Sequence, residues 1–161
     1  MRRLLLPGLL ALGCGYRMTS GGAALPEGIQ RVCVPVFRNQ TAEPALETVF
    51  TQALREQVQR AGKLTEGDCE ARIEGDIQGV SGGLSVYEIQ RGRVASYRAY
   101  ASVLLTLKRQ GRTVSTFAVN GSEDFLPGGD VLEAERNRQA ALRRLTVTLM
   151  RQGYDGLATG W

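Results

Sequence analysis

Along this chain, stretches in which apolar and polar residues alternate are separated by stretches in which apolar residues recur every three or four positions. Alternation places successive side chains on opposite faces of a strand, whereas spacing by three and four places them on one face of a helix. The alternating pattern predicts strands over residues 29–37, 68–78, 93–108 and 113–119. The helical pattern predicts helices over residues 43–61 and 131–151.

The first predicted strand is apolar on both sides. Two sets of apolar residues alternate in it, with Val32, Val34 and Val36 on one face and Ile29, Cys33 and Phe37 on the other. A strand of this kind is typical of a sheet that is covered on both faces. Pro35 has no N–H to donate to a neighbouring strand, so we expect an edge position or a gap in the pairing there.

Both predicted helices carry start and stop signals. The first has Pro44 near its first turn and Gly62 at its end, and the second has Asp130 as its N-cap and Gly153 as its end. The apolar stripe of the first helix consists of Leu46, Val49, Phe50, Ala53, Leu54, Val58 and Ala61. Each helix therefore has one apolar face that must be covered.

The order of these elements predicts the fold class. Gln110-Gly111 is a tight-turn sequence, so the strands on either side of it should form an antiparallel hairpin, while the glycine-rich linker 79–92 has no clear pattern. The order β-α-β-β-β-α predicts an α/β (α+β) two-layer sandwich, with a four-stranded mixed sheet and both helices on one face. The other sheet face should be polar, with Ser, Thr, Arg and Tyr side chains.

Composition narrows the possible functions. The 161 residues are 43% hydrophobic and 22% charged, as in one globular domain, and they include no histidine. The absence of histidine removes the usual general base and the commonest zinc ligand, so we expect no metal site and no catalytic residues. Glu74 and Asp76 share one strand face and could act as an acid/base pair, but a solvated strand face explains them better.

The first residues resemble a bacterial lipoprotein signal. Arg2 and Arg3 precede a short apolar run, and a small residue, Gly13, stands directly before Cys14. We predict a signal peptide over residues 1–13, a tether over 14–28 and a folded domain over 29–161. The expected modification is a diacylglycerol and an N-acyl chain on Cys14. The alternative is ordinary cleavage after Gly13 with no lipid.

Removal of the signal leaves a nearly neutral protein with two further cysteines. The mature chain has 18 basic and 16 acidic residues, a net charge of +2, which gives no indication of nucleic-acid binding. Cys33 and Cys69 would lie in an oxidising compartment and could form a disulfide. Two buried free thiols in neighbouring strands are an equally good interpretation.

Arginines cluster around the third predicted strand. Arg91 and Arg93 flank Gly92, and Arg98 lies on the polar face of the strand. Arginine pairs bidentately with phosphate, so these three residues could contact lipid phosphates. They could equally serve to keep a sheet edge soluble.

The combination of short motifs near the N-terminus resembles the lipopolysaccharide-assembly lipoprotein family, LptE. The matching runs, in order, are Cys14-Gly15-Tyr16-Arg17, Leu25-Pro26-x-Gly28-Ile29 and Val32-x-Val34-Pro35-Val36-Phe37-x-Asn39-x-Thr41-x-Glu43-Pro44-x-Leu46-Glu47. The resemblance implies a protein anchored by lipid on the periplasmic side of the outer membrane. It also implies that the protein plugs the β-barrel LptD, supports its assembly and helps deliver lipopolysaccharide to the surface, with no enzymatic activity.

Two other classes of function are compatible with the sequence. The strand-to-helix junction is also similar to small periplasmic lipoproteins that act as scaffolds or activate a peptidoglycan enzyme. A periplasmic hydrolase would require Glu74 and Asp76 to line a pocket.

Overall fold

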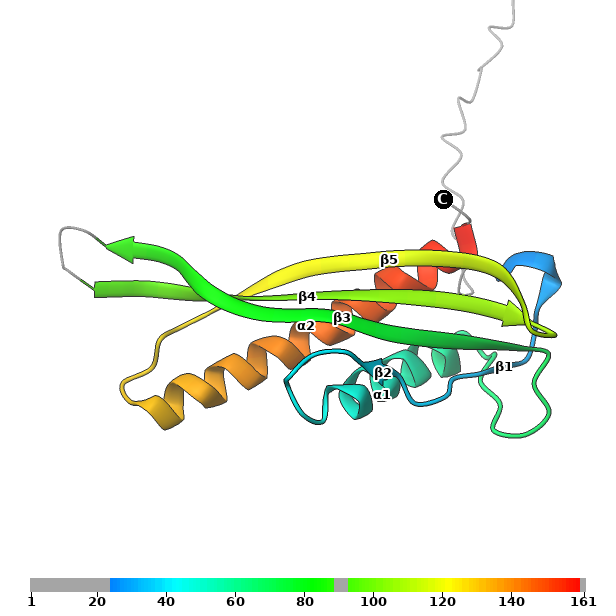
Figure 1. The fold of residues 1–161 in the computed structure, drawn as a ribbon, viewed down its shortest axis with the longest axis horizontal. Helices are drawn as coiled ribbons and strands as arrows, with labels where there is room; N and C mark the ends of the chain where they lie inside the picture. Colours follow the sequence, from blue (N-terminus) through cyan, green and yellow to red (C-terminus); the bar gives the residue numbers. More distant parts are fainter. Residues whose placement is uncertain (1–23, 89–92, 160–161) are drawn as a thin grey trace, which may run out of the picture.

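The computed structural model describes residues 24–88 and 93–159. Its elements follow one another as a short 3-10 helix, two short strands, a helix, three long strands and a long helix (Figure 1). They are η1 (Pro26–Gly28), β1 (Val32–Cys33), β2 (Arg38–Asn39), α1 (Leu46–Arg60), β3 (Ala71–Glu88), β4 (Arg93–Arg109), β5 (Arg112–Phe125) and α2 (Val131–Thr159).

The predicted α+β sandwich is confirmed. The sheet has the order β1-β3-β4-β5, with β2 also paired to β3, and it is mixed because β1 and β2 run parallel to β3 while β4 and β5 are antiparallel. The apolar sides of α1 and α2 pack with the sheet in one core, which includes Phe50, Leu105 and Leu149. α2 lies against β4, β5 and α1, so the two helices form the second layer.

The sheet has five strands and not the predicted four, because the first predicted strand is broken at Pro35. Val32 pairs with Ala71, whereas Arg38 pairs with Asp76, so the segment between the two short strands holds one residue more than its partner. An extra residue moves every following side chain to the opposite face. Val36, which the alternation places with Val32 and Val34, is therefore 63% exposed.

The second helix is longer than predicted. Gly153 does not end it, and the helix continues through Gly156 to Thr159. A Cβ atom built on Gly153 would lie 2.5 Å from Leu105 Cδ1, and one built on Gly156 would lie 2.5 Å from Phe117 Cδ1. Both glycines therefore allow the helix to approach the sheet closely, and here close packing outweighs the low helix propensity of glycine.

The helix starts differ in how well the sequence predicted them. The predicted N-cap of α2 is confirmed, because Asp130 Oδ1 accepts the N–H of Glu133 at 2.7 Å. Helix α1 begins at Leu46, after Ala45 in a left-handed conformation, and not at residue 43. None of the helices described is both long enough and apolar enough to cross a membrane.

The long hairpins extend the sheet beyond the predicted strand ends. Strand β3 continues through residues 79–88, the segment that had no clear pattern, and pairs with β4 along its length. The predicted turn is confirmed, with positive φ angles of 51° at Gln110 and 79° at Gly111. These strands give the molecule its elongated shape (Figure 1).

Candidate functional site

The sheet surface that faces away from the helices is the main candidate site, and we call it the open face. It is formed by alternate residues of β4 and β5, which are Arg98, Tyr100, Ser102, Leu104, Thr106, Lys108, Thr116, Ala118, Asn120, Ser122 and Asp124. Most of these side chains are polar, and none is fully buried. The predicted polar sheet face is thus confirmed.

The predicted site residues fall partly outside the described residues. Cys14 and Arg91 lie outside them. Arg93 begins strand β4 and pairs through its backbone with Glu88. Of the three predicted phosphate-binding arginines, Arg98 is the one with a described side chain.

Arg98 lies on the open face in an ion pair with Asp124. The guanidinium donates from Nη2 to Asp124 Oδ2 at 2.9 Å and from Nε to Oδ1 at 2.5 Å, and the two residues are cross-strand partners of β4 and β5. The hydrogen bonds from Arg98 hold the pKa of the Asp124 carboxyl below its ordinary value. A phosphate at Arg98 would therefore have to compete with Asp124.

The middle of the open face is uncharged. A shallow hollow of about 380 Å³ lies between β3, β4 and β5. Its polar lining is supplied by Ser81, Tyr100, Ser102, Asn120 and Ser122. Hydroxyl and amide groups here can donate and accept hydrogen bonds without carrying charge.

The two candidate catalytic carboxylates each form an ion pair with a basic residue. Glu74 accepts from Lys108 Nζ at 2.8 Å, and Asp76 accepts from Arg38 Nη2 at 2.9 Å. The sequence predicted a solvated position for Asp76, but this residue is only 7% exposed. The reason is that β2 places Arg38 directly opposite it. In the described part of the chain, no cluster of three or more potential metal ligands occurs.

The hairpin between β4 and β5 is held by the segment that precedes β1. Glu27 accepts a hydrogen bond from Arg112 at 2.6 Å and also pairs with Arg109, and the bond from Arg112 is the main cause that lowers the pKa of Glu27. Arg109 and Arg112 therefore share one carboxylate, that of Glu27.

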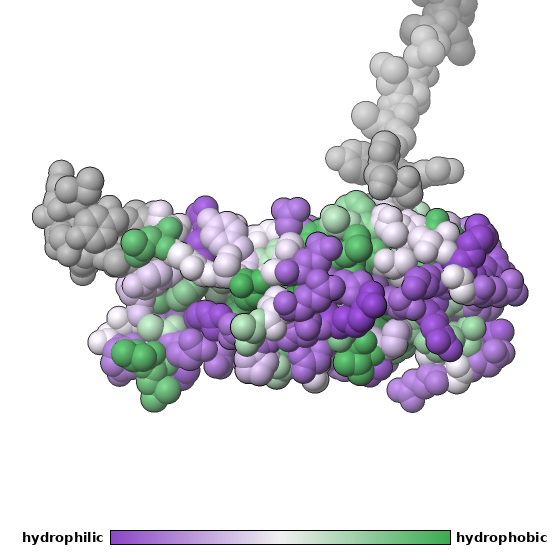
Figure 2. Space-filling view, viewed as in Figure 1, coloured by the Kyte–Doolittle hydropathy of each residue, from purple (hydrophilic) through white to green (hydrophobic). Residues whose placement is uncertain are grey.

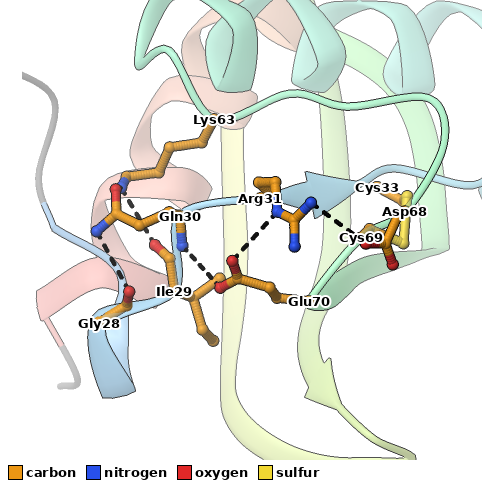
Figure 3. A network of polar contacts seen from close by, with 9 residues as sticks. All are labelled: Gly28, Ile29, Gln30, Arg31, Cys33, Lys63, Asp68, Cys69 and Glu70. Atoms are coloured by element: carbon orange, nitrogen blue, oxygen red, sulfur yellow. Dashed lines mark hydrogen bonds and ion pairs between the residues drawn. A yellow bond between two sulfur atoms is a disulfide. The ribbon is translucent and has the colours of Figure 1, made fainter.

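A second polar network, which we call the N-terminal clasp, joins residues 28–33 to the loop 63–70 (Figure 3). The buried Lys63 donates to the carbonyl of Ile29 at 3.1 Å and to the side chain of Gln30 at 2.9 Å. Arg31 pairs with both Asp68 and Glu70. Cys33 and Cys69 are joined by a disulfide with a Cα–Cα distance of 5.6 Å. The clasp thus fixes the entry of the chain into the sheet.

The strand-to-helix junction after β2 forms a third network. The Asn39 side chain accepts from the N–H and the hydroxyl of Thr41 and donates to the carbonyl of Glu43. Glu43 in turn accepts two hydrogen bonds from Arg138 of α2. The bonds from Arg138 lower the pKa of Glu43, and partial burial opposes this shift. The junction therefore joins the segment directly before α1 to α2.

We expect Arg138→Gln to destabilise the domain at pH 7 by about 1 kcal/mol, the upper range for a partly exposed ion pair. Because the folded-state pKa of Glu43 is lowered, the contribution of the pair is present above the unfolded pKa and is lost as the pH falls through the folded value. Urea denaturation at pH 7 and pH 3 should therefore show a smaller effect at pH 3. Arg144→Gln, which breaks the more exposed pair with Glu123, is the control. An effect that is equal at both pH values would contradict the prediction.

A group of exposed apolar side chains lies at the end of the molecule where α2 begins. Figure 2 shows hydrophilic and apolar side chains mixed over the middle of the visible face, and apolar ones at the end where α2 begins. The exposed apolar residues next to this helix start are Leu126, Val131 and Leu132.

Comparison with known proteins gives one family and a set of structural neighbours. The model of the family LptE, described as lipopolysaccharide-assembly, matches residues 29–156 of the chain. No curated protein matches the chain.

Three solved structures illustrate the fold likeness. A lipoprotein from Caulobacter crescentus is 15% identical, with 77% of this chain and 89% of that chain covered and a TM-score of 0.56. The rare lipoprotein B from Shewanella oneidensis is 12% identical over 79% and 91%, with a TM-score of 0.53. Lipoprotein B from Nitrosomonas europaea is 13% identical over 90% and 91%, with a TM-score of 0.55. At identities this low, the structural likeness shows a shared fold alone.

Proposed function

The chain belongs to the LptE lipopolysaccharide-assembly family, and on this basis we propose that it is a lipid-anchored outer-membrane protein that plugs and supports the assembly of the β-barrel LptD. In this role it would help to deliver lipopolysaccharide to the cell surface and would catalyse no reaction. The single observation that carries the proposal is the family match, which spans the folded domain from Ile29 to Gly156.

The open face supports a position inside a barrel. Wide outer-membrane barrels have a polar interior, so a protein that fills one needs polar side chains on the surfaces that meet the wall. Ser102, Asn120 and Ser122 provide hydroxyl and amide groups there, and Arg98 is neutralised by Asp124. Such a surface can form hydrogen bonds with a polar wall and leaves no net charge at its centre.

The anchor in this proposal is a lipid on Cys14. Residues 1–13 would be the signal peptide, and the tether would run from Cys14 towards the domain. The last residues of the predicted tether already contact the domain, since Leu25 is buried and Glu27 pairs with the β4–β5 hairpin. The disulfide of the clasp then joins the segment that follows the tether to the residues directly before β3.

Contact with lipopolysaccharide phosphates through Arg91, Arg93 and Arg98 stays a part of the proposal. Arginine binds phosphate bidentately, and such contacts weaken as salt is added. Because Arg98 already pairs with Asp124, we assign it the weaker contribution of the three.

Affinity purification from native outer membranes tests the proposal. A C-terminally tagged copy, purified in mild detergent, should retain a large β-barrel protein in stoichiometric amount, identified by mass spectrometry. Recovery of a peptidoglycan synthase instead, or of no barrel, would overturn the proposal and favour an envelope scaffold. A tagged Phe50→Asp variant, whose folded domain should be lost, serves as the control for non-specific recovery.

A further inference from the structure

A second hollow lies beside the N-terminal clasp, and it meets the open face at Arg72, the cross-strand partner of Lys108. Its volume is about 410 Å³. One wall is residues 33–35, which begin at the last residue of β1, and the other is the loop 64–69 before β3, so the Cys33–Cys69 disulfide joins the two walls. Arg55 of α1 and Arg72 of β3 also line it. We call it the clasp pocket.

The two arginines of the clasp pocket have no carboxylate partner among the residues that the structure describes. Arg55 is held by the Val34 carbonyl oxygen, which accepts from Nε at 3.0 Å and from Nη2 at 2.8 Å. This contact orients the guanidinium but leaves its positive charge unneutralised. Arg72 lies on the exposed side of β3.

The nearby carboxylates are engaged elsewhere. Glu70 accepts from Arg31 and from the N–H of Gln30, and Glu74 accepts from Lys108. Asp68 pairs with Arg31. Glu66, at the rim of the pocket, is the acidic residue that lines it, so the lining carries a net positive charge.

We propose that the clasp pocket binds the phosphate group of an anionic lipid headgroup between Arg55 and Arg72. The planar guanidinium of Arg72 matches the geometry of phosphate oxygens, whereas Arg55, whose Nε and Nη2 already donate to Val34, would contribute its charge and its Nη1. A pocket with walls joined by a disulfide loses little freedom when it binds. The lipid source rests on the proposed function: a tether from Cys14 leads directly into β1, whose Cys33 forms part of the wall. The phosphate chemistry rests on the pocket alone.

A titration of the full chain carrying Cys14→Ala tests the pocket without the covalent lipid. The probes are inorganic phosphate and dihexanoyl phosphatidylglycerol below its micelle concentration, followed by NMR chemical shifts of the loop 64–69. We expect the short-chain lipid to bind, and Arg72→Gln to raise its Kd by about tenfold or more, because the variant loses a charge-assisted hydrogen bond to the phosphate. Arg60→Gln removes the same charge from α1 outside the pocket and should leave the Kd within about twofold.

A further variant makes the net charge of the same site more positive. Glu66→Gln removes the rim carboxylate, so it should lower the Kd for the short-chain lipid severalfold. Equal Kd values for Arg72→Gln and Arg60→Gln would overturn the proposal, as would shift changes that fall outside the pocket. Inorganic phosphate that binds as tightly as the lipid would overturn the lipid assignment. Recovery of the barrel from membranes is a separate readout, so failure here and failure of the proposed function are distinguishable.

Discussion

Phe50→Asp should unfold the domain. Phe50 is fully buried in the core between α1 and the sheet. Loss of a buried aromatic side chain costs about 3–5 kcal/mol, and the unpaired carboxylate adds the cost of its desolvation. Since the whole free energy of unfolding of a domain is about 5–15 kcal/mol, this one substitution should remove most or all of it.

Val49→Asp is the matched control, because it introduces the same carboxylate one residue earlier in the same helix. The apolar spacing predicts Val49 and Phe50 as members of one stripe, but the structure leaves Val49 36% exposed. We expect Val49→Asp to keep a cooperative thermal transition, whereas Phe50→Asp should show none by circular dichroism. A native-like melting curve for Phe50→Asp would mean that this helix face does not meet the core.

The apolar pattern predicted the helices and long strands because each of these elements buries one face. The pattern failed where a single extra residue reverses which side chains face the core. Val36 was expected beside Val34 and is exposed, since the extra residue near Pro35 inverts the faces. Thr51 was not expected in the core, yet its hydroxyl accepts the N–H of Phe37 and is buried with it. A polar residue that forms a hydrogen bond with a buried backbone group can lie in the core, and a pattern of apolar residues does not predict it.

The polar contacts of the candidate sites were harder to predict, because they join residues far apart in the sequence. Glu43 and Arg138 are 95 positions apart, and no local pattern links them. Even Arg98 and Asp124 could not be matched by counting back from the hairpin turn. The pairing of Arg109 with Arg112 would place Arg98 opposite Glu123, but a bulge beside Leu107 shifts the register by one residue and brings Asp124 to it.

The cysteines were predictable in part. Their number leaves Cys33 and Cys69 as a pair once Cys14 is set aside, but the sequence alone did not distinguish a disulfide from two free thiols. The structure brings them together because β1 pairs with the start of β3, where Val32 lies opposite Ala71. The clasp pocket between their two segments had no sequence signal, since Arg55 and Arg72 come from a helix face and a strand face that looked like ordinary surface.

Cys14→Ala should abolish incorporation of labelled fatty acid into the protein. The basic residues, the short apolar run and the small residue before Cys14 form the pattern on which the lipid attachment is proposed. One acyl chain binds a membrane only weakly, whereas several chains anchor a protein firmly. A net charge of +2 on the mature chain offers little electrostatic attraction in place of the lipid. The variant should therefore move from the membrane fraction to the soluble fraction.

The other two cysteines provide matched controls for this experiment. Cys33→Ala and Cys69→Ala each break the disulfide but leave Cys14 in place, so both variants should still incorporate the label. Labelling that persists in Cys14→Ala would show that the lipid is attached elsewhere. Absence of label from the unaltered chain would show that the signal is cleaved without lipidation. Loss of the label with unchanged recovery of the barrel would show that the plug reaches its partner without an anchor. Loss of both would mean that confinement to the membrane plane raises the local concentration enough to control assembly.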